Sequence, residues 1–194
     1  MRAARRGTTA YNYVLGQYLG DGHLVTSSRV PVLRIYACSD YPAVTDEIIE
    51  CIREIRGTTP GLVRRRNSAR VVGIQSYWIR WPCLIPQHGP GYKHTRAIRL
   101  ADWQAVMVEA APWPFIRGLI HSDGCRALNR VTAKGRAYAY PRYFFANESS
   151  DILAIAGWAL DLVGVQWRFN RRNSISVARR ESVALMDEHI GPKS

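Results

Sequence analysis

Lysine and acidic residues are scarce in this chain of 194 residues, whereas arginine is abundant. Only 3 of the 27 basic residues are lysine, and the 15 acidic residues leave a formal net charge of +12. A hydrophobic content of 47% excludes a disordered polycation. Two interpretations of the charge stay open: a merely solvated basic surface, or a surface for a polyanion, which the arginine fork suits well.

The chain also lacks cysteine pairs and long hydrophobic runs. Cys38, Cys51, Cys83 and Cys125 form no Cys-x-x-Cys spacing and have no matching histidine pattern, so we expect reduced, structural thiols. No apolar run approaches the ~20 residues that span a bilayer, and the basic residues 1–6 lack the apolar stretch of a signal peptide. We expect an intracellular protein without a membrane partner, cytoplasmic and associated with the nucleoid of a prokaryote.

Basic and acidic residues are segregated along the chain. No carboxylate occurs in residues 55–101, 124–147 or 162–180. Because alternate side chains of a strand share a face, arginine-rich strands there would offer a basic face to a DNA groove. The candidate DNA-binding side chains are Arg29, Arg34, Arg64, Arg65, Arg66, Arg70, Arg126, Arg130, Lys134, Arg136, Arg142, Arg168, Arg171, Arg172, Arg179 and Arg180.

One pattern occurs twice: a glycine-containing apolar segment that ends in Asp-Gly. Its copies are residues 14–22, VLGQYLGDG, and residues 116–124, IRGLIHSDG. Small residues recur at a spacing of four in both copies, as Gly16 and Gly20, and as Gly118 and Ser122. Such spacing strips one helix face of bulk, so we expect the two helices to pack closely. We also expect each helix to end in a left-handed glycine, Gly22 or Gly124.

The elements after the two motifs are expected in the same order. After the first motif the pattern predicts a strand at 30–37, a helix at 40–57, and strands at 62–66 and 70–77. After the second it predicts strands at 126–132 and 138–146, a helix at 151–163, and strands at 166–171 and 174–179. The sequence therefore predicts a duplicated α+β chain with two pseudo-symmetric αββαββα halves, 1–99 and 114–194, joined by a helical linker at 100–113.

Asp21 and Asp123 stand at the expected C-terminal ends of the motif helices. A carboxylate there faces the negative pole of the helix dipole, which costs roughly 0.3–1 kcal/mol unless a cation is near. A plain Asp-Gly turn would explain one copy. Two copies at the ends of two glycine-faced helices indicate metal ligands.

These motifs and the repeated order of elements resemble the LAGLIDADG homing endonuclease family in its single-chain form with two motifs. The resemblance covers nearly the whole chain and implies two halves that pack through the motif helices and present antiparallel sheets to the DNA major groove. It implies that Asp21 and Asp123 bind divalent metal together with the backbone carbonyls of Gly20 and Ser122. We expect Mg²⁺ or Mn²⁺, with Ca²⁺ binding without supporting cleavage.

The resemblance also implies a basic and a polar residue near the hydrolytic water of each half. Lys93 and Lys193, which follow the Gly-Pro segments at the ends of the halves, match the basic role. The alternative for both lysines is contact with phosphate or solvent alone. Asn147 matches the polar role in the second half, and the first half offers Cys38 and Ser39 instead.

The sequence thus predicts a monomeric, metal-dependent, site-specific endonuclease that cuts double-stranded DNA at a long asymmetric target and needs no protein partner. One alternative is a non-cleaving, DNA-binding transcriptional regulator that keeps the fold; another is an RNA-binding splicing factor. Retention of both aspartates favours the nuclease. The motif's earlier acidic position departs from the family pattern, because it holds Leu19 in the first copy and His121 in the second.

Overall fold

Two four-stranded sheets and seven α-helices make up the computed structural model, which describes residues 2–64, 70–133, 135–191 and 193. The first half contains α1 (Arg2–Asp21), β1 (Gly22–Val25), β2 (Val32–Cys38), α2 (Pro42–Arg56), β3 (Gly61–Arg64), β4 (Val71–Tyr77) and α3 (Trp81–Leu84). The turn η1 (Lys93–Thr95) and α4 (Asp102–Ala110) lead to the second half. That half contains α5 (Pro112–Asp123), β5 (Gly124–Ala133), β6 (Arg136–Ala146), α6 (Ser150–Leu162), β7 (Arg168–Arg171), β8 (Ser174–Val177) and α7 (Arg180–Ile190).

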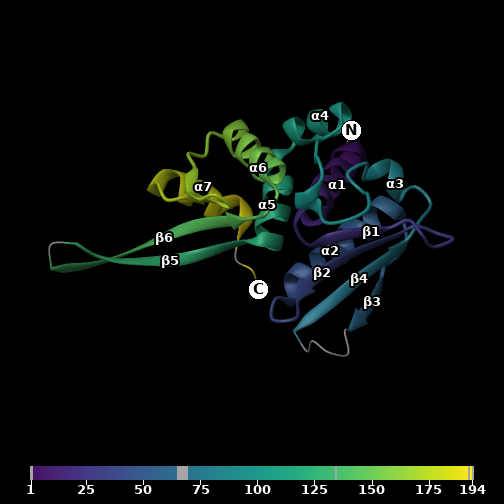
Figure 1. Cartoon of the computed structure of the whole chain (residues 1–194), viewed down its shortest axis with the longest axis horizontal. Helices are drawn as coiled ribbons and strands as arrows, with labels where there is room; N and C mark the ends of the chain where they lie inside the picture. Colours follow the sequence, from purple (N-terminus) through teal and green to yellow (C-terminus); the bar gives the residue numbers. More distant parts are fainter. Residues whose placement is uncertain (1, 65–69, 134, 192, 194) are drawn as a thin grey trace.

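The two sheets have the same topology. Their strand orders are β1-β2-β4-β3 and β5-β6-β8-β7, and every neighbouring pair is antiparallel. In Figure 1 the sheets diverge on either side of α1 and α5, and the β5–β6 hairpin projects far beyond the helices. The matching order confirms the predicted α+β fold with two similar halves.

Glycines bring α1 and α5 into backbone contact. A Cβ atom on Gly16 would lie 2.4 Å from a backbone carbonyl oxygen of α5, and one on Gly118 would lie 2.3 Å from a backbone carbonyl oxygen of α1. A Cβ on Gly20 would lie 2.2 Å from Ser122 Oγ. Real Cβ atoms do not come so close, so only glycine permits this packing. The predicted contact between the small-residue faces is confirmed.

The last glycine of each motif has a different role from the predicted one. Gly124 has φ −103° and ψ 168°, which is extended backbone, and Gly22 is not among the glycines with positive φ. A Cβ on Gly22 would lie 2.4 Å from Tyr18 Cα, and one on Gly124 would lie 2.7 Å from Ile120 Cα. The prediction of a left-handed cap is therefore wrong. Glycine is needed because the chain turns directly from helix to strand against the preceding helical turn.

One face of each sheet packs on helices, and the other face is left open. Leu33 and Ile35 of β2 are fully buried, as is Ile48 of α2, whereas the intervening Arg34 is only partly buried. In β6, Tyr143 and Phe145 are buried in the same core. This alternation places the arginines and other polar side chains of β2 and β6 on the open faces.

Three predicted features of the chain need correction. No strand was predicted between the first motif and residue 30, where the structure has β1 at Gly22–Val25. The strand predicted at 174–179 is β8, which ends at Val177. Arg179 and Arg180 consequently lie at the start of α7, whose buried side chains Val183 and Met186 recur at helical spacing. All four cysteines are free thiols, as predicted, but Cys83 and Cys125 are exposed and so do not pack in the core. None of the described helices is long and apolar enough to cross a membrane.

Candidate active site

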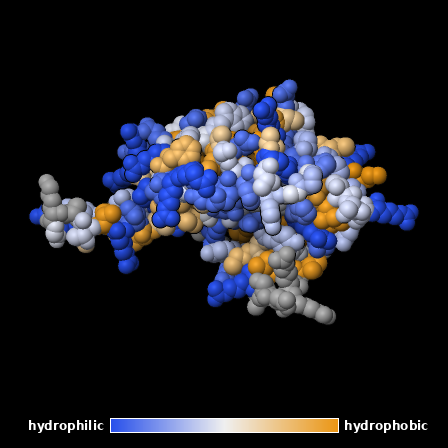
Figure 2. Space-filling model, viewed as in Figure 1, coloured by the Kyte–Doolittle hydropathy of each residue, from blue (hydrophilic) through white to orange (hydrophobic). Residues whose placement is uncertain are grey.

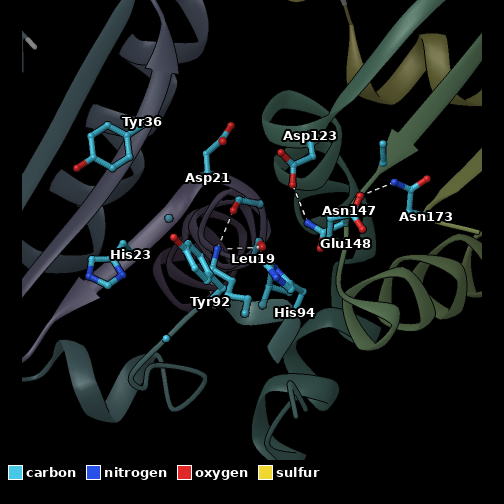
Figure 3. A pocket seen from close by; sticks show the side chains of 15 residues that line it. Leu19, Asp21, His23, Tyr36, Tyr92, His94, Asp123, Asn147, Glu148 and Asn173 are labelled. Atoms are coloured by element: carbon cyan, nitrogen blue, oxygen red, sulfur yellow. Dashed lines mark hydrogen bonds between the residues drawn. The ribbon is translucent and has the colours of Figure 1, made fainter. Parts of the chain in front are cut away.

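Asp21 and Asp123 point into one cleft between the two halves (Figure 3). The cleft has a volume of about 670 Å³ and is lined by residues of both motifs and both sheets. Because the glycines hold the helix ends together, the carboxylate of one motif lies beside the backbone of the other: a Cβ on Gly20 would lie 3.0 Å from Asp123 Oδ2. The structure thus brings the four predicted metal-site residues, Asp21, Asp123, Gly20 and Ser122, together.

Burial disfavours the ionised form of both carboxyls. The pKa of Asp21 rises to about 6, first because burial removes water and second because the Asp123 charge is near. Burial also raises the pKa of Asp123, although a hydrogen bond from Asn147 works against it. The nearby Lys93 and Lys193 favour ionisation of both groups. A cation bound between the two aspartates would relieve the remaining cost.

Asn147 fixes the orientation of the second carboxylate. Its Nδ2 donates to Asp123 Oδ2 at 2.7 Å, and its Oδ1 accepts the Ser149 N–H at 2.9 Å. The backbone N–H of Asn147 donates to Asn173 O at 3.0 Å, just as that of Ser39 donates to Arg70 O in the first half. Ser39 therefore holds the position equivalent to Asn147, and the two halves differ there.

The two predicted lysines reach the ends of the motif helices. Lys93 Nζ donates to Leu19 O at 3.0 Å and to Gly20 O at 2.7 Å, and it also bonds the carbonyl of Tyr18. Burial lowers the pKa of Lys93 to about 8, against the opposing effect of the two aspartates. The ammonium lies on the negative pole of α1, where a cation is favourable.

Lys193 makes the equivalent contact in the second half. Its Nζ donates to Ser122 O at 3.1 Å and to Gly124 O at 2.5 Å. Burial lowers the pKa of Lys193, and the negative charge of Asp21 makes the largest contribution in the opposite direction. A carboxylate at the C-terminal end of a helix needs a nearby cation, and in this structure a lysine lies at the end of each motif helix.

Several residues of the cleft were not predicted from the sequence. Glu148 projects into it beside Asn147, and accepts hydrogen bonds from Asn173 Nδ2 and from Arg172 Nη2, the latter at 3.1 Å (Figure 3). These bonds lower the pKa of Glu148, the Asn173 bond most strongly. His23 and His94 also line the cleft. The one feature of the sequence that could have predicted Glu148 as a cleft residue is its position directly after Asn147.

His121, at the motif's earlier acidic position, is not part of the cleft. It is buried between the motif helices, with Nδ1 3.0 Å from Tyr13 Oη. Burial is the main reason that its pKa falls to about 3. His121 is therefore neutral at ordinary pH and packs in the interface.

The donors in the cleft fit a hard divalent cation. Two carboxylates and the carbonyls of Gly20 and Ser122 are all oxygen ligands of the kind that Mg²⁺ and Ca²⁺ prefer. In the described part of the chain no group of three or more His, Cys, Asp or Glu side chains could hold a metal. An ion would therefore depend on backbone oxygens, water or a substrate phosphate beside the two aspartates.

The predicted DNA-binding arginines divide between the two sheet faces. On β6, Arg142 lies on the open face but is buried, since it donates to Ser176 Oγ at 2.9 Å and lies over the Phe144 ring. Arg126 pairs with Tyr143 across the strands and so lies on the helix-covered face, where it forms an ion pair with Asp187. Arg126 and Arg142 therefore already have partners within the protein, and their contact with DNA stays a prediction.

The other predicted arginines are on the surface or outside the described region. Arg34 is partly buried on the open face of β2, opposite His23 and Gln75. Exposed side chains are Arg29, Arg70, Arg130, Arg136, Arg168, Arg171, Arg172, Arg179 and Arg180. Arg65, Arg66 and Lys134 lie outside the described residues, as does the side chain of Arg64.

No protein-family model and no curated protein sequence matches the chain. Solved structures match its fold. The LAGLIDADG meganuclease I-AabMI bound to uncleaved DNA is 9% identical at a TM-score of 0.58, over 92% of this chain and 83% of that one. I-DmoI in complex with DNA and Mn is 13% identical at a TM-score of 0.57, over 95% of this chain and 98% of that one. The N-terminal LAGLIDADG domain of WhiA is 14% identical at a TM-score of 0.58, over 97% of this chain and 83% of that one. The chain has the LAGLIDADG homing endonuclease fold, as the resemblance predicts.

Proposed function

We propose that this protein is a monomeric, site-specific endonuclease that cuts double-stranded DNA with the aid of a divalent metal. The observation that carries the proposal is the pair of aspartates, Asp21 and Asp123, at two adjoining helix ends in one cleft. Burial makes both carboxylates costly to ionise in the metal-free protein. A protein that only binds DNA gains nothing from two such groups facing phosphate.

The arrangement of the sheets supports duplex DNA as the substrate. Two antiparallel sheets diverge on either side of α1 and α5 (Figure 1), and an antiparallel ribbon fits the major groove of B-DNA. I-AabMI and I-DmoI, which have the same fold, have been solved with DNA. On the face seen in Figure 2, hydrophobic residues form separate patches among hydrophilic ones, which suits action as a monomer.

In this proposal each polar residue of the cleft has a chemical role. Asp21, Asp123 and the carbonyls of Gly20 and Ser122 hold the metal, which when bound supplies Lewis acidity and an activated water. Asn147 keeps the Asp123 carboxylate in place. Lys93 and Lys193 supply positive charge where negative charge develops on the phosphate.

A DNA-binding regulator is the second candidate, and one observation favours it. The carbonyls of Gly20 and Ser122, which the nuclease needs as ligands, already accept hydrogen bonds from Lys93 and Lys193. Unless these lysines move, the cleft holds its own cations and needs no metal.

A selection followed by digestion separates the two candidates. The native chain is first incubated with a randomised duplex library in Ca²⁺, and the bound sequences are recovered and identified. The enriched target is then incubated with Mg²⁺ or Mn²⁺, and we expect a double-strand cut within it. A target that is bound tightly but stays intact identifies a regulator, and enrichment of RNA in place of duplex DNA in a parallel selection identifies a splicing factor.

A further inference from the structure

The two lysines of the cleft make the same kind of contact in both halves, although different secondary structure surrounds them. Lys93 begins η1, between the two halves, whereas Lys193 follows α7 near the end of the chain. Both ammonium groups nevertheless donate to backbone carbonyls at the C-terminal end of a motif helix. Each set includes one carbonyl that the proposed metal site needs: Gly20 O at 2.7 Å from Lys93 and Ser122 O at 3.1 Å from Lys193.

An ammonium and a divalent ion cannot both stay at these positions without a large cost. The final carbonyls of a helix have no partner inside the helix, so a cation there satisfies them and offsets the dipole. A lysine provides this in the metal-free protein. A divalent ion bound to the same carbonyl would repel an ammonium a few ångströms away, and that repulsion strengthens as water leaves the site.

We propose that Lys93 and Lys193 are resident counter-ions of the motif helices, and that a divalent metal displaces each ammonium from the helix end when it binds. This inference rests on the proposed metal site. Displacement gives each lysine two states: in the first it stabilises the helix end, and in the second it is free to contact a DNA phosphate. The metal therefore also releases the two cations that the backbone of the substrate needs.

The structure further assigns an order to the two displacements. Lys93 is held by three carbonyls, those of Tyr18, Leu19 and Gly20, whereas Lys193 is held by two. Asn147 also orients the Asp123 carboxylate for a ligand, through its hydrogen bond at 2.7 Å. We call Asp21 with the Gly20 carbonyl the first half-site and Asp123 with the Ser122 carbonyl the second half-site, each for one metal ion. The second half-site therefore binds its ion first, and the first half-site binds its ion more weakly.

The scarcity of lysine makes the displacement directly observable. Lysine labelled with ¹³C at Cε gives three side-chain signals, from Lys93, Lys134 and Lys193. Addition of Ca²⁺ at constant ionic strength is expected to shift the signals of Lys193 and then of Lys93, and to leave that of Lys134 in place. Assignment comes from the Lys93→Met and Lys193→Met variants, or from Lys→Gln where a Met variant does not fold. Signals of Lys93 and Lys193 that stay fixed while Ca²⁺ binds would overturn the inference.

Calorimetric titration with Ca²⁺ measures the competition itself. Lys93→Met removes the resident cation, so Ca²⁺ affinity at the first half-site should rise on the order of tenfold. Arg53→Met removes one positive charge from the exposed surface of α2, outside the residues that line the cleft, and should leave the affinity unchanged. An unchanged or weaker affinity in Lys93→Met contradicts displacement.

Two aspartate variants separate failure of this inference from failure of the proposed function. Asp123→Asn should remove the tighter Ca²⁺ site and Asp21→Asn the weaker one. If neither variant alters Ca²⁺ binding, the metal site itself is wrong. If both alter it but the lysine signals and the Lys93→Met affinity do not change, the metal site stands and only the displacement is refuted. Loss of the tighter site in Asp21→Asn would reverse the order of binding.

Discussion

At the scale of single residues, the sequence predicts the pairing of Asp21 and Asp123, and the resemblance adds Lys93 and Lys193 as the basic residues of the site. The argument from the helix dipole requires a positive charge near each aspartate, and the structure supplies Lys93 and Lys193. Their contacts with the helix carbonyls could not be derived from spacing, because these contacts depend on the path of the chain after α3 and after α7. Glu148 escaped prediction for the same reason, since its neighbours in the cleft come from a different strand pair.

The raised pKa of Asp21 predicts how the stability of the metal-free protein depends on pH. The folded state holds this carboxyl at a pKa of about 6, above the unfolded value of about 3.9, so the folded state binds more protons between these two values. Its stability therefore falls as the pH rises through this window. Asp21→Asn removes the ionised group and should raise the thermal midpoint above pH 6, with the gain shrinking to nothing below pH 4. Thermal unfolding in EDTA across this range checks the prediction, and a gain that does not vary with pH contradicts it.

At the scale of elements, the spacing of small residues predicts the packing of α1 against α5. It cannot predict the conformation of the final glycines, because a tight helix-to-strand turn and a left-handed cap both require a residue without Cβ. Only the path of the chain after Gly22 and Gly124 decides between them. The structure shows strands that begin directly at these glycines.

The close approach of the helices makes Gly118 intolerant of even a methyl group. Gly118→Ala would place Cβ 2.3 Å from a carbonyl oxygen of α1, and we expect a loss of roughly 1–3 kcal/mol in the free energy of unfolding. Gly7→Ala is the matched control, because it lies in α1 with no atom within 4 Å of the added Cβ. The free energy of unfolding of Gly7→Ala should stay equal to that of the native chain or rise by up to about 1 kcal/mol. Urea denaturation measures both, and equal stabilities would show that the helices do not meet at Gly118.

The predicted strands of each half are present, but the sequence did not supply their register. A shift of one residue moves every side chain to the other face. The observed register places Arg142 on the open face of β6 and Arg126 on the covered face, although both occur on predicted basic strands. The bulge between Phe169 and Arg171 breaks the alternation again in β7. The register therefore decided on which face of the sheet each arginine lies.

At the scale of the whole molecule, the two halves share a topology but differ in what surrounds the cleft. The first half ends in the four-residue helix α3, and the second half ends in the eleven-residue helix α7. The β5–β6 hairpin pairs ten residues on each strand, against four for β1–β2. Duplication could be read from the repeated motifs, whereas these differences in length lie outside the motifs and leave no mark on them. They predict an asymmetric DNA target.

The net charge of +12 predicts a strong dependence of DNA binding on salt. If the exposed arginines contact about six to ten phosphates, a plot of log K against log salt concentration should have a slope of roughly −5 to −9. Fluorescence anisotropy with a labelled duplex in Ca²⁺, at 50 to 300 mM salt, gives this slope. A slope near zero would mean that the arginines form a solvated surface and not an interface.

The most direct test of the central claim compares cleavage and binding by the native chain, Asp21→Asn and Asp123→Asn on one selected duplex. Each substitution removes a charged metal ligand and keeps the size of the side chain, so double-strand cleavage in Mg²⁺ should fall at least a hundredfold, on the order of 3 kcal/mol in the barrier. DNA affinity in Ca²⁺ should stay equal or increase, because a carboxylate beside the phosphates has been neutralised. Cleavage in Mg²⁺ that persists in both variants would contradict the assignment of the two aspartates as the metal-binding centre of a nuclease.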